Sequence, residues 1–269
     1  MGALLNEGRS PGAAPQGGDQ PILRFDNLTL GYDRHPAVHH LRGEVAAGSL
    51  LAVVGPNGGG KSTLLKAIAG ELRPIAGRIE LNGVSPRQIA HLTQQPTIDT
   101  SFPVLVHDFV AMGLWREIGA FAGLTRALQR RVADVLDTVG LGGVERRPVG
   151  ALSGGQLQRA LFARVILQDA PLVLLDEPYG AIDAATVEDL AKLVRHWHDE
   201  GRTVIAVLHD LDHVRQHYPE TWLICRELIA RGDTASVLGE ANLRRARQLA
   251  EASGDAASAA ICHLDPEGR

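Results

Sequence analysis

The chain has 269 residues, 45% of them hydrophobic and 22% charged, and its 27 basic and 31 acidic side chains give a net charge of -4. This length is typical of one large globular domain or two small ones, and the charge balance argues against a dedicated nucleic-acid binder, which is usually basic. Two cysteines argue against a disulfide scaffold, and no apolar run approaches the ~20 residues that cross a bilayer.

The first third of the chain is predicted to contain a leader followed by a β-rich region. Residues 1–20 are rich in Gly, Pro and Ala and lack the features of a signal peptide, so we expect a disordered leader. Residues 22–30 alternate in polarity, which predicts a half-buried strand. The continuous apolar run 49–54 predicts a strand buried on both faces of a mostly parallel sheet. A helix is expected over 62–72 and a short strand over 78–82.

The rest of the chain alternates between helical and extended patterns. Helical spacing at 104–114 and 126–139 predicts a helical subdomain, about 95–160, inserted between strands. Later elements are expected at 172–175 (strand), 184–200 (helix), 203–208 (strand), 223–231 (strand-rich) and 240–252 (helix). The pattern predicts an α/β fold with a mostly parallel core sheet and flanking helices. We divide the chain into the leader, a domain over 21–240, and a C-terminal helix and tail over 241–269.

A phosphate-binding loop follows the buried strand. Residues 55–63 fit G-x-x-x-x-G-K-[ST], placed after a strand and before a helix, as the P-loop requires. Glycines let successive N–H groups point into one concavity, and the helix start adds its positive dipole end. The candidate ATP-binding residues are Gly55, Pro56, Asn57, Gly58, Gly59, Gly60, Lys61, Ser62 and Thr63. Lys61 is expected to reach the β- and γ-phosphates, and the Ser62 hydroxyl to ligate Mg²⁺.

Two carboxylates follow a second buried strand. Four apolar residues, 172–175, precede Asp176 and Glu177. An acid at the end of a strand beside a P-loop is the Walker B pattern, in which Asp176 holds Mg²⁺. Glu177 is expected to be the general base for the attacking water. A surface Asp-Glu pair is common by itself, so this assignment depends on the P-loop.

The peptide Leu152-Ser-Gly-Gly-Gln156 resembles the LSGGQ signature of ABC ATPases. The resemblance spans about 22–240 and implies an ABC-type P-loop NTPase fold with an N-terminal antiparallel β part. In that family the signature closes over ATP bound to a second copy, which implies a homodimer of nucleotide-binding domains. The residues that would do so are Ser153, Gly154, Gly155 and Gln156. Ser153 also suits the N-cap of the following helix.

The resemblance assigns four more residues, which occur in family order. Tyr32 fits the aromatic residue that stacks on adenine, with an ordinary core or surface tyrosine as the alternative. Gln94 fits the Q-loop glutamine, which senses Mg²⁺ and the lytic water, although a second glutamine follows it and Thr93 replaces the usual proline. His209 fits the switch histidine at the γ-phosphate. Asp183 fits the D-loop aspartate, which crosses the dimer interface.

A single cassette without a heptad repeat or zinc insertion resembles the separate ATPase subunit of a bacterial transporter. This implies a peripheral protein on the cytoplasmic face of the inner membrane, bound to permease subunits and serving an extracytoplasmic metal-binding protein indirectly, with no nucleic acid. Residues 98–115 resemble the zinc/manganese importers, with zinc expected first and manganese next. The alternatives are a heme or siderophore-iron importer, a non-transport clamp on a soluble or nucleic-acid partner, and an ATP-binding assembly module without turnover.

The spacing of several histidines suggests a second role for the chain, in metal binding. His209, His213 and His217 are spaced i, i+4, i+8, which places them on one helix face if a single helix carries all three. Such pairs can share a metal ion, so a cytoplasmic zinc sensor is an alternative role. Ordinary solvated surface histidines are the competing interpretation.

Overall fold

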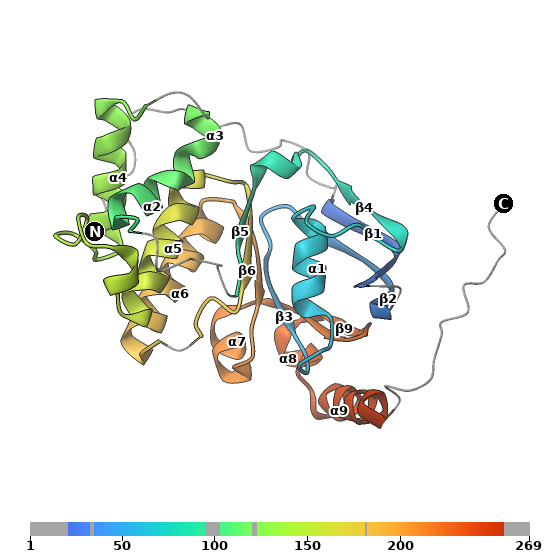
Figure 1. Cartoon of the computed structure of the whole chain (residues 1–269). Coiled ribbons are helices and arrows are strands. Elements are labelled where there is room, and N and C mark those ends of the chain that lie inside the picture. Colours follow the sequence, from blue (N-terminus) through green and yellow to red (C-terminus); the bar gives the residue numbers. More distant parts are fainter. Residues whose placement is uncertain (1–20, 33–34, 95–102, 120–122, 181, 256–269) are drawn as a thin grey trace.

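The computed structural model describes residues 21–32, 35–94, 103–119, 123–180 and 182–255. Figure 1 shows a small β-sheet on one side of the molecule and a group of helices on the other, with a larger sheet between them. The leader 1–20, the segment 95–102 and the tail after residue 255 lie outside the described residues.

The smaller sheet is antiparallel and comes from the N-terminal part of the chain. It consists of β1 (Pro21–Tyr32), β2 (His35–Ala46) and β4 (Ala76–Leu81). Its strand order is β2-β1-β4. The central strand buries Leu23, Phe25, Leu28 and Leu30. The expected antiparallel β part is confirmed, and β2 is a strand that the sequence analysis missed.

The larger sheet is the core of the molecule. Its strands are β3 (Leu50–Val54), β5 (Ile89–Leu92), β6 (Leu172–Asp176), β7 (Thr203–Val207), β8 (Glu220–Cys225) and β9 (Glu227–Asp233). The order is β5-β6-β7-β3-β8-β9, parallel from β5 through β8, with β9 antiparallel to β8. Every residue of β3, β6 and β7 is buried, as their continuous apolar sequences predict.

Nine α-helices lie in the described part of the chain. They are α1 (Lys61–Ile68), α2 (Val106–Ala111), α3 (Trp115–Ile118), α4 (Arg126–Thr138), α5 (Gly154–Gln168), α6 (Ala184–Asp199), α7 (Leu211–His217), α8 (Thr234–Val237) and α9 (Glu240–Asp255). Short 3₁₀ turns occupy Pro86–Gln88, Met112–Leu114 and Val149–Ala151. The helices α2 to α5 come between β5 and β6 in the chain, and α2 packs on both α4 and α5. Figure 1 shows α2, α3 and α4 on the side away from the small sheet.

The structure revises the predicted bounds of three elements. The helix expected over 62–72 ends at Ile68, because Gly70 adopts a left-handed φ of 79° and stops the helix. The helix expected over 104–114 begins at Val106 and passes into a 3₁₀ turn at Met112. The strand-rich stretch near 223–231 is resolved into the antiparallel pair β8 and β9.

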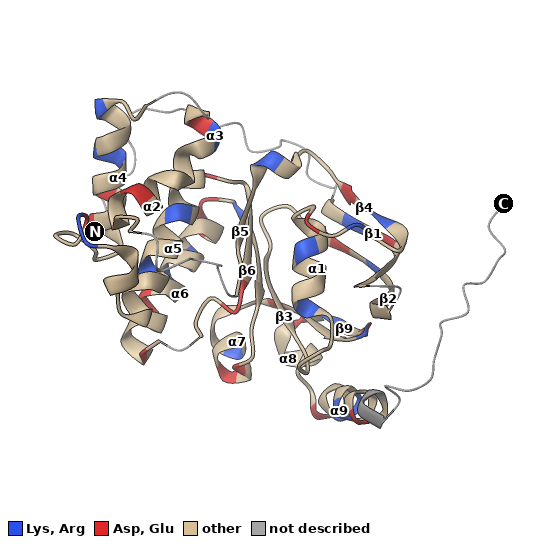
Figure 2. Ribbon diagram, in the orientation of Figure 1, with Lys and Arg blue, Asp and Glu red and all other residues tan. Residues whose placement is uncertain are grey.

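The distribution of charged residues and the hydropathy of the helices agree with the balanced composition of the chain. Figure 2 shows acidic and basic residues side by side on α9 and on the small sheet. Within the described ranges, none of the helices combines the length and apolarity that a bilayer crossing needs.

Candidate nucleotide-binding site

A cavity of about 730 Å³ opens where the P-loop meets the ends of the central strands. This is the edge of an open parallel sheet at which ligands usually bind, and the volume suits a small ligand. The cavity is lined by Ala37, Asn57, Gly58, Gly59, Gly60, Lys61, Ser62, Thr63, Gln94, Glu177 and His209. Ten of these were predicted from the sequence. Ala37 was not, because no motif marks it.

Two glycines of the P-loop are required by close backbone contacts. A Cβ on Gly60 would lie 2.3 Å from Cγ2 of Val38 and 2.6 Å from the carbonyl oxygen of Ala37. A Cβ on Gly55 would lie 1.9 Å from the carbonyl oxygen of Ile224. Gly60 has a φ of 92° and precedes α1, whose first turn has no side-chain cap. The loop therefore packs closely between β2 and β8. The backbone N–H groups at the start of α1 are available to bind an anion.

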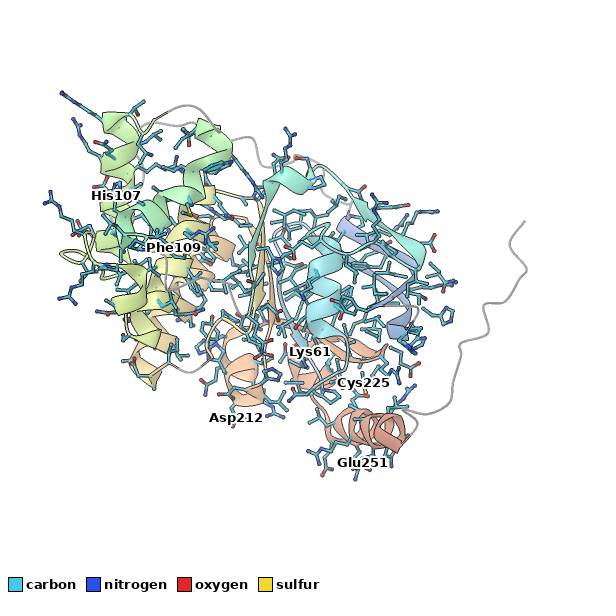
Figure 3. The ribbon with its side chains drawn as sticks, in the orientation of Figure 1. Lys61, His107, Phe109, Asp212, Cys225 and Glu251 are labelled. Carbon is cyan, nitrogen blue, oxygen red and sulfur yellow. The ribbon has the colours of Figure 1, made fainter. Side chains whose placement is uncertain are left out.

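Lys61 places a buried cation in this loop. Its Nζ donates to the carbonyl oxygens of Gly55 and Pro56, each at 2.9 Å. Burial lowers the pKa of Lys61, and the nearby carboxylates of Glu177 and Asp176 oppose that shift. Figure 3 shows Lys61 at the start of α1, near Cys225. A positive group held by backbone carbonyls beside N–H donors is a site suited to phosphate oxygens.

Ser62 and Asp176 bring two oxygen ligands together. The Ser62 hydroxyl donates to Oδ1 of Asp176 at 2.9 Å, although the two residues are 114 positions apart in the chain. Asp176 is only 3% exposed. Burial raises the pKa of Asp176, and the hydrogen bond from Ser62 lowers it. A hydroxyl beside a carboxylate is a donor set that fits Mg²⁺, which prefers oxygen ligands.

Three separate chain segments meet on the Glu177 carboxylate. Nε2 of Gln94, which follows β5, donates to Oε2 of Glu177 at 2.6 Å. Nε2 of His209, which follows β7, contacts Oε1. The residues expected to be catalytic, Gln94, Glu177 and His209, are thus brought together.

The backbone of Glu177 is held in an uncommon conformation. Its φ is 50°, in the left-handed region that costs energy for a non-glycine residue. The N–H of Glu177 donates to the Val207 carbonyl at 3.1 Å. The side chain of Gln158 donates to the Pro178 carbonyl at 2.6 Å. These bonds tie the loop after β6 to β7 and to α5.

The signature peptide lies at the start of α5 and does not line the nucleotide cavity of its own chain. Ser153 is the N-cap, as expected, and exchanges hydrogen bonds with Gln156 in a capping box. A Cβ on Gly155 would lie 3.6 Å from Oδ2 of Asp183. Asp183 in turn caps α6 by accepting from the Thr186 N–H at 2.9 Å. The signature and D-loop residues are therefore neighbours of each other and separate from the P-loop cavity.

Tyr32 also stands outside the cavity lining. It is the last residue of β1, pairs with His35 and is 49% exposed. The exposed ring is free to meet a planar ligand, and the adenine role stays a prediction. Gly55, Pro56 and Asp176 touch the site through hydrogen bonds to lining residues.

The three histidines spaced i, i+4, i+8 do not share one helix, so the condition for a common helix face is not met. Asp210 caps α7, so His209 precedes the helix and only His213 and His217 belong to it. Among the residues that the structure describes, no group of three or more His, Cys, Asp and Glu side chains could hold a metal ion. Within those residues the zinc-sensor alternative therefore has no site. Cys262 and His263, two adjacent potential metal ligands in the C-terminal tail, lie outside the described residues.

A P-loop after β3 of a parallel sheet, with two carboxylates at the end of β6 and the strand β7 between the two, defines a P-loop nucleotide hydrolase. Residues 38–180 match the sequence model of the family described as ABC transporter. The chain belongs to the ABC transporter family and is an ATP-hydrolysing subunit of it.

Named relatives and a solved structure agree with this assignment. The manganese transport system ATP-binding protein MntB of Halalkalibacterium halodurans is 37% identical over 81% of this chain and 88% of the relative. The zinc transport system ATP-binding protein TroB of Treponema pallidum is 34% identical over 83% and 86%. A chain from an inward-facing metal-chelate type ABC transporter superposes with a TM-score of 0.75 at 31% identity, covering 85% of this chain and 90% of that one.

Proposed function

We propose that this chain hydrolyses Mg-ATP to drive uptake of a divalent metal ion, zinc or manganese, through a membrane permease. The observation that carries the hydrolytic part is the convergence of Gln94 and His209 on the Glu177 carboxylate. The metal is inferred from relatives that are named for manganese and for zinc transport. Residues 98–115, 209–215 and 230–238 resemble the zinc/manganese importer group as a whole, so the order of zinc before manganese is part of the proposal and is tested by the metal assay below.

In this proposal the P-loop binds the phosphates of ATP. Lys61 and the open N–H groups at the start of α1 supply positive charge toward the β- and γ-phosphates. Ser62, Asp176 and Gln94 would hold Mg²⁺, which neutralises developing charge on the phosphate oxygens when bound. Tyr32 offers its exposed ring to the adenine base.

The chemical step needs a positioned water and a base. Glu177 accepts the proton of the attacking water, and Gln94 and His209 orient the carboxylate from both sides. His209 additionally places a polar ring nitrogen near the γ-phosphate. Little covalent chemistry is required of the protein, because phosphoryl transfer depends mainly on positioning and charge neutralisation.

A second copy of the chain would complete each site. Ser153, Gly154, Gly155 and Gln156 lie outside the cavity of their own chain, and Asp183 lies beside them. In a head-to-tail homodimer these residues reach the nucleotide of the partner copy. ATP binding then closes the dimer, and hydrolysis with product release reopens it.

The permease is the expected membrane partner. A smaller cavity of about 140 Å³ lies between β5 and α5 and is lined by His91, Leu92, Thr93, Leu161, Arg164, Val165 and Gln168. We place the docking segment of the permease in this groove, on the cytoplasmic face of the inner membrane. An extracytoplasmic metal-binding protein would act only through the permease.

A second candidate function is the import of a metal chelate such as heme or a siderophore. The observation that favours it is the 31% identity to a chain of a metal-chelate type transporter. The permease and its binding protein choose the substrate, so the ATPase site is compatible with either function. Among the residues that the structure describes, no contact favours a non-transport clamp or an assembly module without turnover.

Cellular metal content tests the proposed transport function. Cells that lack the protein are assayed for zinc, manganese, iron and cobalt together, then complemented with the natural chain or with Glu177→Gln. A zinc or manganese deficit that only the natural chain restores supports the proposal. An iron deficit that depends on a supplied chelate supports the second candidate, and unchanged metal content with intact ATPase activity contradicts both.

A further inference from the structure

A cluster of aromatic side chains lies between α6, α7 and the loop after β6. The ring of His213 makes an edge contact with Tyr179, with centroids 4.8 Å apart. The same ring lies 4.3 Å from His217 and 6.2 Å from Tyr218. None of these four side chains lines the nucleotide cavity.

The contact between His213 and Tyr179 joins two segments of the hydrolytic site. Tyr179 follows Glu177 by two positions in the strained loop after β6. His213 lies in the first turn of α7, and its N–H donates to the Asp210 side chain at 3.1 Å. Asp210 directly follows His209, so this ring pair connects the loop of the expected base with the segment of the switch histidine.

The packing around His213 favours a neutral ring. Nε2 of His213 is buried and has no hydrogen-bond partner among the described residues. Protonation gives both ring nitrogens an N–H, so the N–H at Nε2 would stay buried without an acceptor, which is costly. The pKa of His213 lies below its ordinary value, mainly because of burial and secondly because of His217.

The charged groups that face His213 come from two helices. On α6, Arg195 disfavours and Glu188 favours protonation of His213. At the start of α7, Asp210 favours it. Arg195 contacts Nδ1 of His217, and because a guanidinium only donates, that nitrogen must accept and carry no proton.

Burial raises the pKa of Tyr179 to about 12, and burial also raises the pKa of Tyr218. The two tyrosines therefore stay neutral in acid, and the two histidines are the rings of this cluster whose charge can change as the pH falls.

We propose that His213 is a positioning residue for ATP hydrolysis, whose neutral ring packs on Tyr179 and holds the Glu177 loop in its hydrolytic geometry. Protonation of His213 weakens that contact, so acid lowers turnover through this ring. The inference rests on the proposed role of Glu177 as the base. It adds a residue that neither binds nucleotide nor touches the reacting atoms.

Three substitutions separate packing from ionisation. His213→Ala removes the ring, and we expect kcat at pH 7.5 to fall about fivefold while KM for ATP changes less than about twofold, the range expected for loss of one aromatic pair. His213→Phe keeps the ring without a titrating group, so it is expected to restore most of that loss. His196→Phe is the matched control, because His196 is an exposed α6 histidine that bonds Glu200.

The pH profile of the full-length chain supplies the decisive readout. The ratio of kcat at about pH 5.8 to kcat at pH 7.5 is expected to be about threefold higher in His213→Phe than in the natural chain. His196→Phe should keep the natural ratio. His217→Gln removes a group that lowers the pKa of His213, so it should make the ratio smaller than in the natural chain. Thermal melting of each variant at both pH values shows that the assayed protein is folded.

Two results would overturn the proposal. The first is an unchanged pH ratio in a folded His213→Phe variant. The second is a raised ratio in His217→Gln but not in His213→Phe, which would move the titration to His217. Failure of the proposed base is distinguishable, because it appears as normal hydrolysis by Glu177→Gln whatever the His213 variants do.

Discussion

The side-chain amide of Gln94 donates a 2.6 Å hydrogen bond to Oε2 of Glu177. This bond links the end of β5 to the end of β6 across the nucleotide cavity. Gln94 is the last described residue before a segment that leads to the helices α2 to α4. A displacement of Gln94 would therefore reach the expected base through a single hydrogen bond.

Replacing Glu177 with glutamine should separate ATP binding from hydrolysis. The amide keeps the size of the side chain but cannot take a proton, so we expect turnover to fall roughly 10²–10⁴-fold while ATP binding is retained. Phosphate release measures turnover, and size-exclusion chromatography with ATP should show an accumulated dimer. Rapid steady-state hydrolysis by this variant would remove Glu177 from the role of base.

Lys61→Ala should weaken ATP binding. The substitution removes the buried cation of the P-loop, and charge-assisted bonds to phosphate are strong, so we expect a loss of about tenfold or more in affinity. Isothermal titration with ATP measures it. Lys66→Ala on the same helix is the matched control, since Lys66 does not line the cavity; equal affinity in both variants would argue against the assigned role.

Gly60→Ala should damage both stability and ATP binding. Both Gly60 and Gly70 have left-handed φ angles, so alanine at either site costs roughly 1–2 kcal/mol of backbone strain. Only Gly60 adds a steric conflict, because its Cβ would lie 2.3 Å from Val38, whereas a Cβ on Gly70 meets nothing within 4 Å. Urea unfolding and ATP titration of the two variants should therefore differ, and identical behaviour would contradict the close packing of the P-loop on β2.

Asp176→Asn should weaken the dependence of hydrolysis on Mg²⁺. The amide keeps an oxygen near Ser62 but loses the charge that attracts the cation, so the Mg²⁺ concentration at half-maximal activity should rise about tenfold or more. The measurement is phosphate release against Mg²⁺ concentration after treatment with a chelator. Asp199→Asn, at the end of α6, serves as the control and should leave the Mg²⁺ curve unchanged.

Acid should destabilise the folded chain below about pH 6.5, the ordinary pKa of histidine. Burial lowers the pKa of His39, His213 and His217 in the folded state. The unfolded chain therefore binds these protons first, and the stability present above pH 6.5 is lost as the pH falls toward the folded pKa values. Melting temperatures between pH 7.5 and 5.5 should decline, with a shallower decline in His213→Phe. A flat profile would show that these rings ionise freely when folded.

Local patterns predicted most of the core but missed a strand beside the site. The apolar runs of β3, β6 and β7 are read directly from the sequence, because strands buried on both faces need no alternation. β2 has no such pattern, and its register comes from pairing with β1, including Val38 opposite Leu30. Ala37 reaches the cavity through that pairing. The start of α7 illustrates the same limit, since the N-cap at Asp210 excludes His209 from the helix.

The phosphate loop, the two carboxylates and the signature peptide can be identified from the amino-acid sequence, because each is a contiguous motif whose chemistry depends on neighbouring residues. Which distant side chains share one carboxylate becomes visible only when the chain is folded. Gln94 and His209 are 83 and 32 positions from Glu177, and they meet because the parallel strands β5, β6 and β7 end at the same edge of the sheet. The contact of His213 with Tyr179 has the same origin, since adjacent strands bring the segments that follow them side by side.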